Sequence, residues 1–344
     1  MNNTAMGEAF GRVNLMGEHV DYNAGCVIPL QINRSVKVSI KQNNNIGGIN
    51  IKSENYDDEI LANVLSKKMD NWADFIIGAC FIFSEEFNIS IEKLFIDINS
   101  NLPIGIGVSS SAAVTVAMLR ALSNYYKIDI QKEKLVKLAH SVEKDFVGVA
   151  GGLMDQFASI YGATDKALFL DTKSNKFELI EISNNYDFLI IDSGKQRILT
   201  DGTLNEKKES CRIISKKLNI EHLCQLSELG HENIKVLSNN EVEIARHVIL
   251  ENQRSILGKT TLAQGDLEQF GRLMTQSHKS LRDLYKVSTS ELDLLVDLCN
   301  SFGSLGSKLT GAGFGGAIVT LIKKELVEDL KMFIIENYPN AKFL

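Results

Sequence analysis

The segment LPIGIGVSSSAA runs from Leu102 to Ala113 and gives the clearest structural signal in the chain. Gly105 and Gly107 have no Cβ atom, so the backbone around them can approach a ligand closely. The loop ends in serines where an alanine-rich helical pattern begins, and the free N–H groups of a helix start favour an anion. The segment is therefore predicted to be a phosphate-binding loop or, alternatively, a glycine-rich turn before a serine-capped helix.

Two better-known nucleotide motifs do not fit this loop. No Gly-Lys-Ser/Thr triplet follows it, which excludes a Walker A loop, and Ser110 replaces the third glycine of a dinucleotide fingerprint. No acidic residue ends a following second strand at the spacing that dinucleotide-binding folds use. The sequence of this loop therefore argues against a dinucleotide-binding dehydrogenase.

The composition is typical of a globular protein of more than one domain. The chain has 344 residues, of which 44% are hydrophobic and 23% charged. Its net charge of −6 argues against a general nucleic-acid binder. The five cysteines form no CxxC pair, which predicts reduced thiols and neither disulfides nor a zinc site. No apolar run reaches the roughly 18 residues of a membrane span, and the N-terminus does not read as a signal peptide.

Hydrophobic patterning predicts a mixture of strands and helices without regular βαβ alternation, which favours an α+β fold. We place a domain boundary at residue 185, giving an N-terminal domain 1–185 and a C-terminal domain 186–344. Residues 11–66 are expected to be mainly strands. Further strands are expected at 94–98, 167–170, 188–192 and 317–322. Helices are expected at 71–86 (with Asp70 as its cap), 109–125, 131–147, 155–161, 241–257, 267–284 and 325–337.

Three other segments carry polar or glycine-rich patterns. GRVNLMGEHVDYN (Gly11–Asn23) supplies both donors and acceptors, which suits a polyhydroxylated substrate or a solvated loop between strands. LTGAGFGG (Leu309–Gly316) is either a turn between core elements or a loop that approaches a ligand. In GLMDQ (Gly152–Gln156), Asp155 is predicted to be a general base or the N-cap of the next helix.

Taken together, these segments resemble the galactokinases of the GHMP small-molecule kinase superfamily. The Gly11–Asn23 segment is similar to the family's sugar signature, and LPIGIGVSSSAA to its phosphate loop. KLTGAGFGGA (Lys308–Ala317) is similar to the third motif, and GLMDQF (Gly152–Phe157) to the catalytic-aspartate segment. The stretches HVILENQR from His247 and SHKSLRDLYKVSTSELDLLV from Ser277 also follow the family pattern, so the resemblance covers most of the chain.

The resemblance implies a two-domain GHMP kinase-like fold with the active site in the cleft between domains, and transfer of phosphate from ATP to the C1 hydroxyl of galactose with Mg²⁺. Asp155 would act as a base or an orienting charge, and Arg12 would stabilise the charge of the transferring group. The implied sugar contacts are Glu18, His19, Asp21 and Gly152. The implied ATP-binding residues are Trp72, Phe75, Gly105, Gly107, Ser109, Ser110, Ser111, Gly311 and Gly313. The implied magnesium ligands are Ser111 and Glu143. Trp72 and Phe75 could equally be core residues.

Two positions depart from the family pattern. Phe10 stands where the family has proline, and Gly202-Thr-Leu-Asn205 stands where the family has Ser-Glu-Tyr-Asn. Leu204 cannot donate the hydrogen bond that the family's tyrosine makes to the sugar. Galactose is the expected substrate; the alternatives are N-acetylgalactosamine or another galactose-like sugar and, in a different class, a non-catalytic sugar sensor. We expect a cytoplasmic monomer that binds a small sugar and neither nucleic acid nor membrane.

Overall fold

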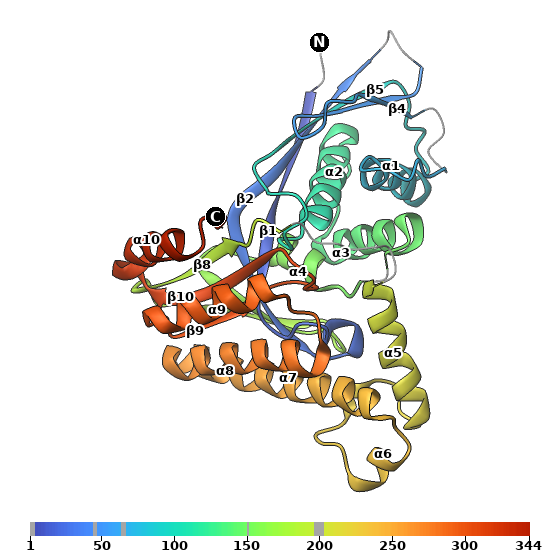
Figure 1. Ribbon diagram of the computed structural model, residues 1–344. Coiled ribbons are helices and arrows are strands. Elements are labelled where there is room, and N and C mark those ends of the chain that lie inside the picture. The colour runs from blue at the N-terminus through green and yellow to red at the C-terminus, as the bar shows by residue number, and fades with distance from the viewer. Residues whose placement is uncertain (1–3, 44–46, 63–66, 150, 196–202) are drawn as a thin grey trace. The chain divides into compact units, whose positions relative to one another are not determined.

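The computed structural model describes residues 4–43, 47–62, 67–149, 151–195 and 203–344, in which helices and strands are mixed along the whole chain (Figure 1). The predicted α+β class is confirmed. Two compact units are present, and neither is one continuous stretch. The first takes the N-terminal residues up to Arg12 together with Gln31–Pro103 and Ser109–Gly162; the second takes Val13–Leu30, Ile104–Val108 and Ala163–Leu344.

The long strands β1 (Thr4–Met16) and β2 (Cys26–Gln42) explain this division, because each contributes residues to both units. The units are discontinuous, and the predicted domain boundary at residue 185 stays a prediction. In the described ranges, no helix is long and apolar enough to cross a membrane.

In the first unit, the residues of β2 from Val36 to Gln42 pair antiparallel with β5 (Leu94–Ser100). β3 (Ile49–Ser53) lies parallel to β5 on its other edge and pairs antiparallel with β4 (Ile60–Ala62). The helices of this unit are α1 (Asp74–Phe87), α2 (Ser110–Tyr126), α3 (Lys132–Ser141) and α4 (Met154–Tyr161). The alanine-rich α2 is the buried centre of this group and packs against the other three.

Two predicted helices of this unit have other bounds than expected. The helix expected from Asn71 begins at Asp74, and Asp70 is not its cap. Asp70 has a left-handed backbone (φ 55°), and the Asn71 side chain accepts the N–H of Ala73 at 2.9 Å, so these polar residues form a turn before the helix. The helix expected over 131–147 is α3 followed by a π turn, Val142–Val147.

In the second unit, four strands form an antiparallel sheet in the order β11 (Lys342–Phe343), β8 (Tyr186–Asp192), β10 (Ala317–Lys323) and β9 (Gly306–Leu309). β6 (Lys166–Asp171) pairs with the Cys26–Leu30 part of β2, and β7 (Lys176–Glu181) pairs with β6. The central strand β10 is buried along nearly its whole length, which fits its continuous apolar run.

The second unit also contains helices. They are α5 (Thr203–Lys217), α6 (His231–Lys235), α7 (Asn239–Gln264), α8 (Leu267–Ser280), α9 (Ser290–Phe302) and α10 (Val327–Asn337). A capping box begins α7, because the Ser238 side chain accepts the N–H of Glu241 and the Glu241 carboxylate accepts the N–H of Ser238. The helix expected over 267–284 is α8 followed by a π turn at Leu281–Tyr285. Both α8 and α9 pack on β9.

Candidate active site

Arg12 and Asp155, the predicted catalytic pair, are in direct contact in the first unit. Arg12 is buried in β1, and its Nε and Nη2 atoms lie 2.8 and 2.6 Å from the same carboxylate oxygen, Oδ1 of Asp155. The hydroxyl of Ser109 donates to the other oxygen, Oδ2. Both oxygens are therefore held by fixed donors, while the Asp155 side chain keeps 26% of its surface exposed. The carboxylate is oriented and still reachable.

The alternative reading of Asp155 as a helix cap is wrong. The N-cap residue of α4 is Leu153, which makes no side-chain cap, and Asp155 lies within the first helical turn. Its carboxylate contacts Arg12 and Ser109, which come from a strand and from the start of another helix. The double glycine before α4 includes Gly152, which is half-buried directly ahead of this turn.

Glu143 lies in the π turn after α3 and is buried in the first unit. Gln156 donates to its Oε2 atom at 2.6 Å, and the Ser111 hydroxyl is close to the same carboxylate. Burial and the charge of Asp155 raise the pKa of Glu143 to about 7, and the nearby Ser111 hydroxyl, Gln156 and Arg12 act in the opposite direction. A buried carboxylate beside a serine hydroxyl is an oxygen donor set that fits Mg²⁺.

The glycine-rich loop before α2 has the backbone that its sequence predicts. Gly105 and Gly107 have φ angles of 77° and 93°, and a Cβ atom on Gly105 would meet nothing within 4 Å. Ser109, at the N-cap of α2, is left-handed (φ 60°) and makes no cap hydrogen bond, and the first helical turn holds no acidic side chain. Ser110 and Ser111 form that first turn. The free N–H groups of a helix start remain available there for an anion.

The aromatic pair expected near adenine lies at the start of α1. Trp72 is half-buried and stacks on Tyr56, with ring centroids 4.7 Å apart and planes 2° from parallel. Phe75 is half-buried in the first turn of the helix. Neither ring is a fully enclosed core residue. Their contact with a nucleotide stays a prediction.

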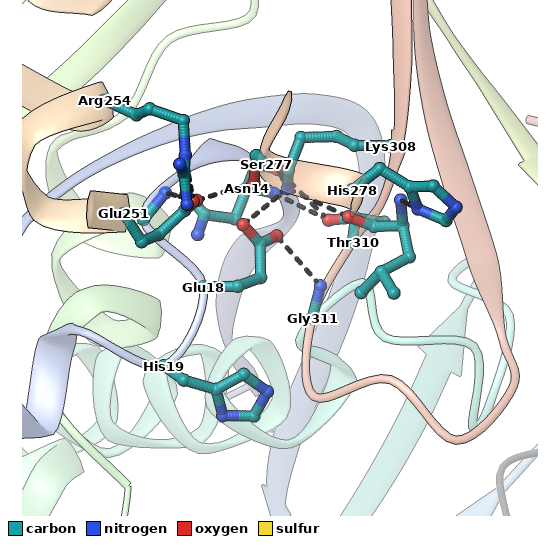
Figure 2. Close-up of polar contacts among 12 residues, drawn as sticks. Asn14, Glu18, His19, Glu251, Arg254, Ser277, His278, Lys308, Thr310 and Gly311 are labelled. Atoms are coloured by element: carbon teal, nitrogen blue, oxygen red, sulfur yellow. Dashed lines mark hydrogen bonds and ion pairs between the residues drawn. The ribbon is translucent and has the colours of Figure 1, made fainter. Parts of the chain in front are cut away.

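In the second unit, the sugar signature forms a corner after β1 that holds Glu18 and His19 (Figure 2). Both side chains are buried, with 3% and 5% of their surface exposed. Glu18 forms an ion pair with Lys308, and its Oε1 atom accepts the N–H of Gly311 at 3.3 Å. Burial raises the pKa of Glu18 to about 7 in spite of Lys308, which lowers it. Asp21 lies in the short 3-10 turn Asp21–Asn23 and is half-buried.

The tautomer of His19 follows from its partners. Its Nε2 atom lies 3.2 Å from the carbonyl oxygen of Ala312, and its Nδ1 atom lies 2.8 Å from the hydroxyl of Tyr22. Because a carbonyl oxygen can only accept, Nε2 carries the proton and Nδ1 accepts from Tyr22. The Tyr22 hydroxyl also lies 3.0 Å from that of Tyr285. The His19 ring is thus oriented from one side by the carbonyl group of Ala312 and from the other by the hydroxyl of Tyr22, which itself contacts Tyr285.

Sequence reasoning missed a second buried ion pair beside this corner. Glu251 and Arg254, both in α7, are paired at 2.8 Å, and Glu251 is fully buried (Figure 2). Burial would raise the pKa of Glu251, but Arg254, His247 and Lys308 outweigh it, and the pKa falls to about 2. The sequence signal that could have found this pair is the spacing of His247 and Glu251. They lie four residues apart among apolar residues of a helix, which places both on the same helix face.

In the glycine-rich segment Leu309–Gly316, one glycine is required by close packing and another donates a hydrogen bond to Glu18. Gly311, Gly313 and Gly315 have φ angles of 80°, 83° and 114°. A Cβ atom on Gly313 would lie 2.3 Å from the carbonyl oxygen of Val287, so packing alone requires glycine there. The turn interpretation is correct for Gly313, while the N–H of Gly311 is used by Glu18. Contact of this loop with ATP stays a prediction.

The segment that departs from the family pattern lies at the start of α5. Leu204 is half-buried in its first turn, and Gly202 lies outside the described residues.

Comparisons with known proteins agree with this set of motifs. The profile of the GHMP kinases N terminal domain matches residues 74–163, that of the GHMP kinases C terminal matches 259–340, and the galactokinase galactose-binding signature matches 2–42. A galactokinase from Thermotoga maritima is 37% identical over 333 residues, which cover 96% of this chain and 93% of that protein. A galactokinase from Streptococcus thermophilus is 34% identical, with 95% and 88% of the two chains covered.

Solved structures give the same result for the fold. The crystal structure of Lactococcus lactis galactokinase complexed with galactose has a TM-score of 0.92 and 29% identity, covering 99% of this chain and 92% of that one. Methanococcus jannaschii mevalonate kinase has a TM-score of 0.73 at 24% identity, which shows a shared fold alone. With relatives above 30% identity along nearly the whole chain, this protein belongs to the galactokinase family of the GHMP kinases.

Proposed function

We propose that this protein transfers the γ-phosphoryl group of ATP to the anomeric hydroxyl of galactose and releases ADP and galactose 1-phosphate. Membership of the galactokinase family supports the substrates, since this chain covers 93% and 88% of two relatives of that name. The observation that carries the mechanism is the contact of two Arg12 nitrogens with one oxygen of Asp155. That contact fixes a carboxylate and a cation side by side.

The chemistry needs both groups. A sugar hydroxyl is a weak nucleophile at neutral pH, and Asp155 accepts its proton or orients it as the new O–P bond forms and the bond from phosphorus to ADP breaks. Arg12 compensates the negative charge that develops on the transferring phosphoryl group. Ser109 steadies Asp155 from the other oxygen, so that the base does not rotate away. The intact pair argues against the non-catalytic sensor.

The loop before α2 is proposed to bind the triphosphate. Gly105 and Gly107 allow the phosphates to approach the backbone, and Ser109, Ser110 and Ser111 offer hydroxyl and N–H donors at the helix start. Mg²⁺ would be held by Ser111 and Glu143 and would neutralise phosphate charge. Among the described residues, no three His, Cys, Asp or Glu side chains are grouped to hold a metal. A magnesium ion here would therefore depend on phosphate and water for most of its ligands.

The sugar is proposed to contact Glu18, His19, Asp21 and Gly152, and adenine to lie against Trp72 and Phe75. Leu204 favours one second candidate: a 1-kinase for N-acetylgalactosamine or another galactose-like sugar, because the family's tyrosine hydroxyl is missing there. We further propose that the protein works as a cytoplasmic monomer without a nucleic-acid partner.

The test is a coupled ADP-release assay with galactose, N-acetylgalactosamine, glucose and arabinose. Wild type should use galactose best, and Asp155→Asn should lower kcat by about 10²- to 10⁴-fold while ATP affinity stays within about twofold. Asp165→Asn, at an exposed aspartate, is the matched control and should behave as wild type. Most activity retained in Asp155→Asn would remove this residue from the mechanism, and another sugar used efficiently in place of galactose would favour the second candidate.

A further inference from the structure

The backbone corner Gly17–Glu18–His19 is strained. Gly17 has a φ angle of 98°, and a Cβ atom there would lie 2.6 Å from the carbonyl oxygen of Cys26. His19 is not a glycine, yet its φ angle is 65°. A left-handed backbone is unfavourable for a residue that has a Cβ atom, and it persists only where surrounding contacts determine it. The contacts that hold this corner therefore bear on where the His19 ring points.

Each residue of the corner is held through its backbone by a buried side chain. The N–H of Gly17 donates to Oε1 of Glu251 at 2.9 Å. The carbonyl oxygen of Glu18 lies 3.2 Å from Nε2 of His247, and that of His19 accepts from Asn23 at 2.9 Å. Glu251 and His247 both come from α7, one helical turn apart. One helix thus fixes the peptide group that enters the corner before Gly17 and the peptide group that joins Glu18 to His19.

Lys308 holds the same corner through a side chain. It is fully buried in β9, and its ammonium group has three acceptors for its three protons: the Glu18 carboxylate, the carbonyl oxygen of Asn14 at 3.2 Å and that of Leu309 at 2.9 Å. Figure 2 shows Glu18 between this ammonium group and the N–H of Gly311. Lys308 therefore joins β1, the corner and β9.

Stability alone does not account for these charges. A buried ion pair recovers little more than its own desolvation cost, and apolar side chains of similar volume often stabilise a fold equally well. Apolar side chains, however, cannot accept the N–H of Gly17 or direct both oxygens of Glu18. The carboxylate of Glu251 does the first, and is itself fixed by Arg254 at 2.8 Å and by Ser277 at 2.7 Å. The charged groups therefore contribute the orientation of the Gly17 peptide and of the Glu18 carboxylate.

We propose that Lys308, Glu251 and His247 are positioning residues that hold the strained Gly17–His19 corner and thereby set the orientation of Glu18 and His19 toward the sugar. None of the three is assigned a contact with substrate. The proposal rests on the proposed function, because it takes Glu18 and His19 to be sugar contacts. It predicts that damage to the clamp weakens sugar binding selectively and leaves ATP binding intact.

The test compares Lys308→Met and Glu251→Met with a matched control, Thr261→Val. Thr261 is also buried in α7, but its hydroxyl donates to the carbonyl oxygen of Gly258 in its own helix and has no bond to the Gly17–His19 corner among the described residues. Calorimetry measures the affinity for galactose and for a non-hydrolysable ATP analogue, and thermal unfolding gives Tm. We expect at least about tenfold weaker galactose binding in both clamp variants, as for loss of a charged hydrogen bond, with ATP-analogue affinity within about twofold. The control should lower Tm and change neither affinity.

A milder variant covers the case in which a clamp variant does not fold. Ser277→Ala removes one of the two hydrogen bonds to Oε1 of Glu251 and should weaken galactose binding about two- to fivefold. Folded variants with wild-type galactose affinity, or an equal loss of galactose and ATP-analogue affinity, would overturn the proposal. Failure of the proposed function is a separate result, since wild type itself would then not phosphorylate galactose; the affinities are in that case measured with whichever sugar wild type uses.

Discussion

A shift from pH 7.5 to pH 5 should remove the contribution that the neutral ring of His247 makes to the free energy of unfolding. The ring is fully buried, and Nε2 must carry a proton because it donates to the carbonyl oxygen of Glu18, so Nδ1 accepts from the Ser280 hydroxyl. Burial lowers the pKa of His247 to about 4; Arg254 and Lys308 lower it too, and Glu251 opposes them. The unfolded chain therefore binds a proton between about pH 6.5 and 4 that the folded chain does not.

The magnitude follows from the two pKa values. The gap from 6.5 to about 4 corresponds to about 3.4 kcal/mol at about 1.4 kcal/mol per pH unit, if the pH fell below both values. At pH 5 about 2 kcal/mol of this is lost, and at pH 7.5 almost none. Because the folded pKa is lowered, stability is present at high pH and falls as the pH drops through this window. Glu18 and Glu143, with pKa values raised to about 7, contribute in the opposite direction.

Since several groups titrate in the same pH range, the assay must compare wild type with a variant that lacks the His247 ring. Urea unfolding of wild type and His247→Gln at pH 5 and pH 7.5 gives four free energies of unfolding. The glutamine amide can still donate toward Glu18 but does not titrate, so the variant should lose about 2 kcal/mol less than wild type between the two pH values. Equal losses in the two proteins, within about 0.5 kcal/mol, would refute the assignment of His247 as a buried neutral ring.

Two further results are expected. Excess chelator should stop ADP release and Mg²⁺ should restore it, and Glu143→Gln should raise the Mg²⁺ concentration for half-maximal rate about tenfold or more; unchanged rates in chelator would rule out the magnesium site. Leu204→Tyr, at the first turn of α5, should lower the KM for galactose about two- to tenfold by adding a neutral hydrogen bond. An unchanged KM with an intact fold would mean that this turn does not reach the sugar.

Local patterns predicted most of the elements, and the family resemblance singled out two residues, Arg12 and Asp155, that are in contact. The start of α2 was predicted within one residue, because a glycine-rich loop gives way there to alanine and leucine. Arg12 and Asp155 were singled out by motif and do meet, although 143 positions separate them. The cap at Asp70 was predicted wrongly, since an aspartate next to asparagine fits a turn as well as a cap, and tertiary contacts decide between them.

The clamp around the sugar signature could not be predicted in this way. Lys308 and Asn14 are 294 positions apart, and Glu251 and Gly17 are 234 apart, so no local period reports their contact. Lysine and glutamate are usually exposed, and their burial depends on a partner that only the fold supplies. The motif around Lys308 was visible, but its role in holding Glu18 was not.

The discontinuous units have a consequence for the order in which the protein is made. Residues 13–30 leave the ribosome early, but they belong to the unit whose other strands and helices lie beyond residue 162. The first unit has all its residues once Gly162 has emerged, whereas the Gly17–His19 corner must wait for α7 and then for Lys308. Such long loops close slowly. We expect a chain interrupted before β9 to contain a complete first unit and a Gly17–His19 corner that lacks Lys308. A truncation late in the sequence would thus remove a contact of a segment near the N-terminus.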